Sequence, residues 1–114
     1  MSLLDKHCVP CEGGTDPLTE QRENELHSAV PEWHLNREGI HQISREFTLK
    51  NFKGALEFIT QVGEIAEAEG HHPDLNLHNY KKVTVTLTTH AINGLSENDF
   101  IMAAKIDQLL KKLV

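Results

Sequence analysis

The strongest constraint on this chain is a helix pattern that stops abruptly at residues 70–73. From Phe52 to Glu69, apolar residues recur at three- and four-residue steps, which predicts one amphipathic helix. Gly70 occupies the position of a left-handed, helix-ending residue, and Pro73 prevents the helix from resuming. The chain must therefore turn a corner there. The expected apolar stripe of the helix consists of Phe52, Ala55, Leu56, Ile59, Val62, Ile65 and Ala66.

A strand pattern follows this corner. From Lys82 to Thr89, apolar and polar residues alternate, so that Val83, Val85 and Leu87 share one face and three threonines the other. A short extended piece is expected before it at residues 75–80. The pair Asn93-Gly94 after the strand marks a turn.

Two further helices and a hairpin complete the expected order of elements. Thr19 is a good N-cap for a surface helix that continues to about Val30, where Pro31 stops it. A hairpin follows, with its turn at residues 37–39, and the last helix begins at Ser96 and runs nearly to the C-terminus. The order helix–strand–strand–helix–strand–strand–helix predicts an α+β fold, an antiparallel sheet with the helices packed on one face.

Length and composition set further limits. The 114 residues predict one domain, preceded by an irregular N-terminal arm at residues 1–17. A formal net charge of −6 argues against nucleic acid as a ligand, because phosphate contacts need clustered Lys and Arg. An apolar run of about 18 residues is missing, and so is an apolar leader region, so no membrane span and no secretory signal are expected. The chain is therefore expected to be cytoplasmic.

The last helix is apolar on more than one face. One stripe suffices for docking on a sheet, so the excess predicts burial against a second subunit and hence a homo-oligomer. The apolar residues concerned are Phe100, Ile101, Met102, Ala103, Ala104, Ile106, Leu109, Leu110 and Leu113.

Histidines near the corner are the candidates for acid–base chemistry, because imidazole exchanges protons near neutral pH. Glu67 and His71 are four residues apart and are expected to stack on the last helical turn, while Pro73 pushes His72 toward an extended conformation. The alternative is an exposed helix-end pair favoured by the helix dipole. His90 is expected on the polar, threonine face of its strand, open to a substrate or simply exposed.

Asp99 has two interpretations. Ser96 and Asp99 fit a capping box, with Ser96 as the N-cap residue and Asp99 at the third helical position. Asp99 could in addition orient the turn that carries His90. Both interpretations stay open from the sequence.

Metal binding is the main chemical alternative. Glu67, His71, His72 and His90 could supply zinc ligands, but adjacent histidines rarely both reach one ion and no HExxH pattern is present. Cys8 and Cys11 have CxxC spacing with His7 nearby, but there is no second pair and no strand–helix context for a redox motif. An inert arm is the preferred interpretation of this segment.

Three segments together resemble the pterin-4a-carbinolamine dehydratase family. They are Glu67-Ala68-Glu69-Gly70-His71-His72-Pro73, the strand Lys82 to His90, and Gly94-Leu95-Ser96-Glu97-Asn98-Asp99. The resemblance covers residues 18–114, including Pro31-Glu32-Trp33, and implies one domain over that range. It implies a four-stranded antiparallel sheet with three helices, in a dimer or tetramer. The segment at residues 75–80 is one residue longer than in some members, which leaves the alignment of Tyr80 and its role open.

The resemblance also implies a function. The family dehydrates 4a-hydroxytetrahydrobiopterin, left by aromatic amino-acid hydroxylases such as phenylalanine hydroxylase, to quinonoid dihydropterin, without a metal or organic cofactor. The catalytic histidines correspond to His71, His72 and His90, with His71 and His90 exchanging protons, His72 positioning the substrate, and Glu67 tuning His71. The implied substrate contacts are His71, His72, Pro73, Thr89, His90, Ala91 and Ile92.

A binding module is the competing class of function. In animals this family also resembles a dimerisation cofactor of a homeodomain transcription factor, which acts through its helical oligomer surface. The apolar last helix is compatible with such a protein–protein role. Direct contact with DNA is not expected, given the net negative charge.

Overall fold

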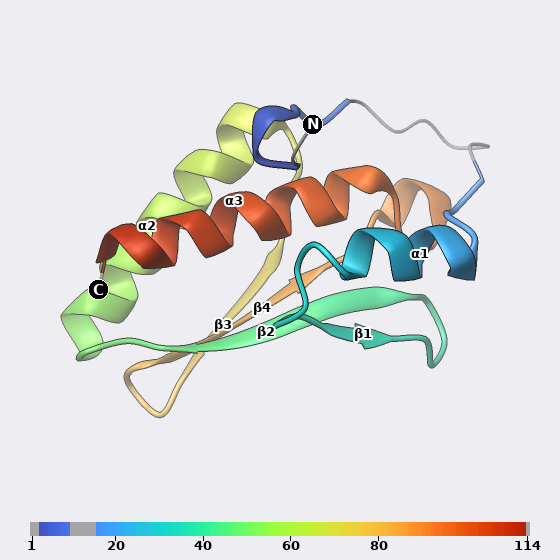
Figure 1. Ribbon diagram of the computed structural model, residues 1–114. Coiled ribbons are helices and arrows are strands. Elements are labelled where there is room, and N and C mark those ends of the chain that lie inside the picture. Colours follow the sequence, from blue (N-terminus) through green and yellow to red (C-terminus); the bar gives the residue numbers. More distant parts are fainter. Residues whose placement is uncertain (1–2, 10–15, 114) are drawn as a thin grey trace.

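A four-stranded antiparallel sheet carries the helices on one face (Figure 1). The computed structural model describes residues 3–9 and 16–113. Their order confirms the α+β prediction, with two short 3-10 helices added. In chain order the elements are η1 (Leu3–Asp5), α1 (Glu20–His27), β1 (His34–Asn36), β2 (Gln42–Thr48), α2 (Phe52–Glu69), β3 (Asp74–His78), β4 (Lys82–Leu87), η2 (His90–Ile92) and α3 (Glu97–Leu113).

The strand order is β1-β2-β4-β3, so the two longest strands lie at the centre. Their register places Ile43 opposite Leu87 and Phe47 opposite Val83, and all four side chains are buried beneath the helices. Phe47 also contacts Trp33, with ring centroids 5.9 Å apart. The alternation read from the sequence is therefore the burial pattern of β4, although the strand ends at Leu87 rather than at Thr89.

Helix α2 has the predicted bounds but not the predicted buried stripe. The side chain of Asn51 caps its start by accepting from the N–H of Gly54 at 2.8 Å, and Gly70 ends it at φ 66°. The buried residues are Ala55, Phe58, Val62 and Ala66. Phe52 and Leu56, which were assigned to the stripe, are 49% and 44% exposed. The predicted stripe was shifted around the helix, since the sheet and α3 cover only a narrow arc.

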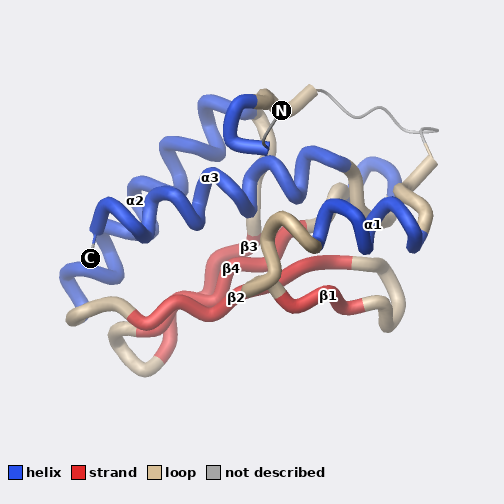
Figure 2. Tube along the Cα trace, in the orientation of Figure 1, coloured by secondary structure: helices blue, strands red, loops and turns tan. Residues whose placement is uncertain are grey.

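Most of the apolar surface of α3 that the sequence assigned to a contact with another subunit is covered within one chain, and the expected homo-oligomer stays a prediction. Helix α3 lies over the sheet between α1 and α2, and η1 covers part of its outer side (Figure 2). Most of its apolar residues are covered by these elements of the same chain. The buried ones are Phe100, Ile101, Met102, Ala103, Ile106 and Leu109.

The N-terminal segment is more ordered than the predicted irregular arm. Residues 3–9, named here the N-terminal strap, begin with η1, and Leu3 is part of the hydrophobic core. The strap runs over α3 toward the end of α2 (Figure 1). Cys8 belongs to the strap, whereas Cys11 lies outside the described residues.

Helix α1 begins as predicted and ends early. The Thr19 hydroxyl accepts from the N–H of Arg22 at 3.2 Å, and the helix stops at His27 rather than Val30. It is less superficial than expected, because the carboxylate of Glu23 is fully buried between Arg37 (2.9 Å) and His41 (2.8 Å) of the hairpin. Among the described residues, no helix combines the length and the apolar character that crossing a membrane requires.

Candidate active site

Three segments of the chain meet at one buried carboxylate, that of Asp99. Its Oδ1 lies 2.6 Å from Nε2 of His71, just after α2. Its Oδ2 accepts from the hydroxyl of Thr89 at 2.8 Å and from the N–H of Ser96 at 3.0 Å. The Asp99 side chain is 0% exposed and that of His71 is 12% exposed. The corner after α2, the turn after β4 and the start of α3 are thereby joined.

Local backbone geometry explains how His71 reaches this carboxylate. Gly70 adopts the left-handed conformation that the sequence predicts, and the N–H of His71 donates to the carbonyl of Ala66 at 3.2 Å. The first residue of the corner is thus tied to the last turn of α2. Its imidazole leaves the helix toward α3 instead of continuing along the helix face.

Asp99 satisfies both interpretations made from the sequence. As in a capping box, its side chain accepts from the N–H of Ser96. The hydroxyl of Ser96 lies 2.8 Å from that of Thr89, so it turns toward the β4–α3 connection. The same carboxylate also holds Thr89, directly before His90, and thus orients the turn that carries His90.

The His71–Asp99 contact determines which ring nitrogen of His71 stays free. A carboxylate oxygen only accepts, so the hydrogen of the contact sits on Nε2 of His71. Nδ1 then carries the free lone pair of the neutral ring. Among the described residues, no protein group contacts Nδ1. A carboxylate in this position also stabilises the imidazolium that forms when Nδ1 takes a proton.

Glu67 contacts His72 and not His71, so the predicted stacking of Glu67 on His71 is wrong. The Oε2 atom of Glu67 lies 2.5 Å from Nε2 of His72. Both side chains are exposed, at 77% and 63%. The helix ends at Gly70, so His71 no longer follows the four-residue spacing on which the expectation rested.

His90 is not on the threonine face of β4, where the sequence placed it. The strand ends at Leu87, and His90 is the first residue of the 3-10 helix η2, which ends at Ile92 and is capped by Asn93 with φ 53°. The side chain is exposed, as expected. It follows Thr89, whose hydroxyl contacts Asp99, so the backbone of His90 lies close to the His71–Asp99 pair.

The turn at residues 89–94 leaves two backbone donors open. The N–H and C=O of Thr89 are used within the turn, pairing with Gly94 and Ile92. The side chains of Thr89 and Ile92 are buried, whereas Ala91 is exposed. Among the interactions of the described residues, the N–H groups of His90 and Ala91 have no partner. Within the turn at residues 89–94, these two N–H groups are therefore available as hydrogen-bond donors.

The geometry does not support the metal alternative. His71 is turned toward Asp99 and His72 toward Glu67, in different directions. Residues 3–9 and 16–113 contain no cluster of three or more metal-ligating side chains. Of the two residues of the CxxC pair, Cys8 is described and Cys11 lies outside the described residues.

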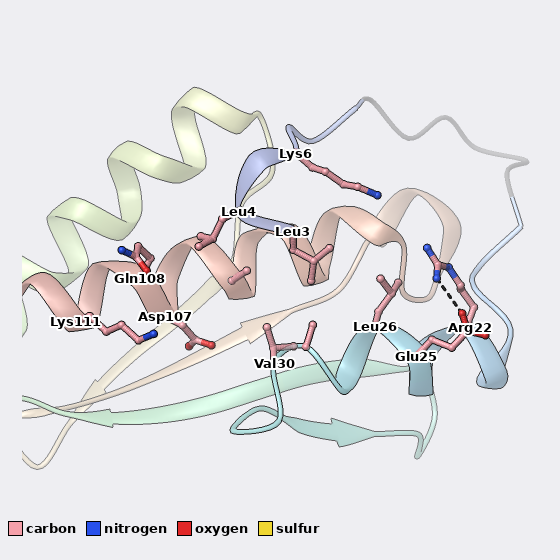
Figure 3. A pocket seen from close by; sticks show the side chains of 12 residues that line it. Leu3, Leu4, Lys6, Arg22, Glu25, Leu26, Val30, Asp107, Gln108 and Lys111 are labelled. Carbon is pink, nitrogen blue, oxygen red and sulfur yellow. Dashed lines mark hydrogen bonds and ion pairs between the residues drawn. The ribbon is translucent and has the colours of Figure 1, made fainter. Parts of the chain in front are cut away.

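A cavity of about 420 Å³ lies elsewhere, between η1, α1 and α3 (Figure 3). Leu26 and Val30 form part of its apolar wall, and Lys6, Arg22 and Asp107 are among its polar residues. Burial raises the pKa of Asp107 although Trp33 and Arg45 donate to its carboxylate. None of the histidines predicted as catalytic lines this cavity, so its size does not make it the candidate site.

Comparison with protein families shows to which family the chain belongs. The sequence model described as "Pterin 4 alpha carbinolamine dehydratase" matches residues 16–109, a range that contains His71, His90 and Asp99. The chain belongs to this family. In this member of the pterin carbinolamine dehydratase family, the buried Asp99 and the two open N–H groups lie inside the matched range. The N-terminal strap lies outside it.

Similar proteins extend over nearly the whole chain. A protein of Halorhodospira halophila, provisionally named a pterin-4-alpha-carbinolamine dehydratase, is 50% identical over 109 residues, covering 96% of this chain and 98% of its own. One from Chlorobium luteolum with the same provisional name is 44% identical and covers 99% of this chain and 100% of its own. Both relatives are therefore about as long as this dehydratase-family chain.

Solved structures agree with the fold. The crystal structure of a transcriptional coactivator/pterin dehydratase from Brucella melitensis has a TM-score of 0.75 and 36% identity, covering 82% of this chain and 98% of its own. A pterin dehydratase-like protein identified as a RuBisCO assembly factor in the alpha-carboxysome shares the fold, with a TM-score of 0.57, 20% identity and coverage of 68% and 87%. Named roles in this fold thus include both pterin chemistry and protein assembly.

Sequence reasoning missed the partner of His71. Asp99 was singled out as a capping residue, but no sequence signal joins it to a histidine 28 positions earlier. Two further polar residues beside this pair, Glu69 and Asn98, belong to the segments that resemble the family, but the sequence indicated no separate role for them. The feature that distinguishes them is their low exposure. Polar residues are usually exposed, and a sequence pattern does not predict which single one is buried.

Proposed function

We propose that the protein dehydrates a 4a-hydroxytetrahydropterin to the quinonoid dihydropterin. The observation that carries this proposal is the imidazole of His71, held through Nε2 by the buried carboxylate of Asp99. Family membership supplies the substrate class. The reaction needs one group to protonate the leaving 4a-hydroxyl and one to accept the proton of N5. Imidazoles perform both steps near neutral pH.

His71 is the proposed base. Its Nδ1 lone pair accepts the N5 proton while Asp99 stabilises the imidazolium that results. His90 is the proposed acid, which donates a proton to the 4a-oxygen so that the C4a–O bond breaks and water leaves. The electron pair freed at N5 completes the quinonoid double bond, and both histidines regain their starting protonation by exchange with water. No metal or organic cofactor takes part in this scheme.

Substrate orientation is assigned to the surrounding backbone and to His72. The free N–H groups of His90 and Ala91 face no partner within the described chain, so they are available for acceptors on the edge of a planar pterin. Pro73 fixes the corner beside His71. His72, exposed and paired with Glu67, serves to position the ring rather than to exchange protons.

A direct assay tests the proposal. The 4a-hydroxypterin is generated by a phenylalanine hydroxylase turning over in the same cuvette, and its decay is followed by absorbance with and without this protein. We expect acceleration over the spontaneous rate, and its loss in the double variant His71→Ala/His90→Ala. A decay rate equal to the spontaneous one with the folded wild-type protein would exclude the function.

Self-association through α2 is a second proposal. Phe52 and Leu56 project from α2 with about half of their surface exposed, whereas the apolar residues of α3 are covered within the chain. Exposed apolar patches on helices mark protein contacts. The Brucella melitensis relative is named a transcriptional coactivator as well as a pterin dehydratase, which is compatible with a protein-binding role. We expect light scattering to show an oligomer that Leu56→Glu dissociates; a wild-type monomer would refute this second proposal.

A further inference from the structure

The N-terminal strap, residues 3–9, connects the end of α2 to the start of α3. Leu3 is buried in the core, and the carbonyl of Leu4 accepts from Nζ of Lys105 on α3 at 3.2 Å. Beyond η1, the chain passes over α3 toward the corner that ends α2 (Figure 1). Two polar residues receive the strap there, one from each helix: Glu69 and Asn98.

Glu69 is the attachment on α2. Its side chain is 8% exposed, an unfavourable place for an anion because it lies at the negative end of the helix dipole. The strap offsets this cost with two hydrogen bonds to the carboxylate of Glu69, from the N–H of Cys8 to Oε1 at 2.7 Å and between Nδ1 of His7 and Oε2 at 2.9 Å. Nζ of Lys105 lies 3.6 Å from Oε2. Burial alone would raise the pKa of Glu69, but these contacts together hold it below its ordinary value.

Asn98 is the attachment on α3. Its Oδ1 accepts from the N–H of Val9 at 3.0 Å, and its Nδ2 donates to the carbonyl of the same residue at 2.5 Å. This side chain is buried as well. A two-bond contact between a side-chain amide and one residue's backbone fixes both distance and orientation. The strap is thus held to α3 as well as to α2.

These attachments lie beside the proposed base. Glu69 is two residues before His71, and Asn98 is one residue before Asp99. The strap therefore makes a second cross-link between the same two helix ends that the His71–Asp99 bond joins. A hydrogen bond tolerates little displacement, so the relative position of these helix ends decides whether it forms.

We propose that the N-terminal strap positions the His71–Asp99 pair, with Glu69 and Asn98 as the positioning residues. Removing either attachment lets the end of α2 and the start of α3 move apart, which lengthens the Nε2–Oδ1 contact and frees the imidazole to change tautomer. The structural part of this inference stands by itself, and its kinetic consequence rests on the proposed dehydratase function.

Two variants of the full chain test it, Asn98→Ala and Glu69→Ala. Long-range proton–nitrogen NMR spectra of the histidine rings report the tautomer of His71 without any substrate. We expect the wild-type protein to show the hydrogen on Nε2 and both variants to shift toward a mixture of tautomers. In the dehydration assay, kcat should fall on the order of tenfold while KM changes by less than about twofold.

Matched variants separate positioning from general damage. Glu69→Gln keeps an acceptor for the N–H of Cys8, so it should restore most of the wild-type ring spectrum. Lys6→Ala removes only the half-exposed ion pair of the strap with Glu97 (3.1 Å) and should resemble the wild type. If Asn98→Ala does not fold, Val9→Pro removes the same N–H contact from an exposed strap residue and is measured instead.

The outcomes are distinct. Ring signals of His71 that stay at the wild-type positions in both the Asn98 (or Val9) and the Glu69→Ala proteins overturn the inference. Shifted signals accompanied by an unchanged kcat in an active enzyme refute the kinetic consequence of the inference. A wild-type protein without dehydratase activity refutes the proposed function, and the ring spectra then still decide whether the strap positions the pair.

Discussion

Nε2 of His71 and Oδ1 of Asp99 lie 2.6 Å apart although 28 residues separate them in the chain. The carboxylate that orients this imidazole also caps the first turn of α3 and holds the hydroxyl of Thr89. Helix capping and orientation of a proposed base are therefore one structural feature. A change at Asp99 alters both, whereas a change at His71 alters only the second.

Replacing His71 by alanine should abolish most dehydration without unfolding the protein. The ring is at the edge of the core, 12% exposed, and its loss removes the proposed base. We expect kcat to fall by about 10²- to 10⁴-fold. Steady-state kinetics measure this effect, and His34→Ala, at an exposed histidine of β1, serves as the control. Similar kcat values for the two variants would contradict the role of His71.

Asp99→Asn should lower activity while leaving most of the fold intact. The amide oxygen can still accept from Ser96 and Thr89, but the NH₂ group would face Nε2 of His71 and favour the opposite tautomer. We expect a loss in kcat on the order of 10²-fold and a loss in the free energy of unfolding of about 1–3 kcal/mol. Kinetics and urea denaturation measure the two effects. An unchanged His71 ring spectrum would argue against this explanation.

Glu67→Gln should have almost no effect, in contrast to what the sequence indicated. The Glu67–His72 contact is exposed on both sides, and such ion pairs contribute about 0–1 kcal/mol. We expect kcat within about twofold of the wild-type value, since His71 is oriented by Asp99. A large fall in kcat would show that Glu67 acts on the reaction through His72.

Gly94→Ala should destabilise the turn that carries His90. A Cβ atom at Gly94 would lie 2.8 Å from Cβ and 3.0 Å from Cγ of Pro17, a rigid ring held nearby by the bond from the N–H of Leu18 to the carbonyl of Leu95. We expect a loss of about 1–3 kcal/mol in the free energy of unfolding.

Gly63→Ala is the matched control for Gly94→Ala. Apart from its chain neighbours and the local backbone of the helix, no atom of the described residues lies within 4 Å of its added Cβ, and the residue is inside α2. We expect a gain of about 0.5–1 kcal/mol, because alanine is the better helix former. Thermal or urea unfolding compares both proteins with the wild type. Equal stability of the two variants would show that Pro17 gives way.

The strap should loosen in acid. Contacts to the ionised form lower the pKa of Glu69 from the ordinary 4.5, so the folded state binds this proton less readily than the unfolded state. Its contribution to stability is therefore complete above the unfolded value and is lost as the pH falls through the lowered folded value. We expect the stability difference between wild type and Glu69→Gln to shrink from about pH 6 to about pH 3. A pH-independent difference would contradict this assignment.

The sequence determined the features that depend on neighbours along the chain. The periodicity of residues 52–69, the left-handed Gly70, the N-cap at Thr19 and the alternation in β4 all follow from interactions within a few residues, so each could be predicted locally. The family motif lies on the same segments. The predicted bounds differ from the observed ones near a tertiary contact: β4 ends at Leu87, and His90, which follows the Thr89 bonded to Asp99, lies in η2.

Only the tertiary structure decided which side chains meet. Much of the apolar surface of α3 is covered by the sheet, α1, α2 and η1 of the same chain, and hydrophobicity alone does not show which atoms provide that cover. His71 contacts Asp99 and not Glu67, because the four-residue spacing brings two side chains together only while the helix continues. The attachment of residues 3–9 to Glu69 and Asn98 likewise joins positions far apart in sequence. Such pairings depend on packing in three dimensions, which leaves no periodic trace in the chain.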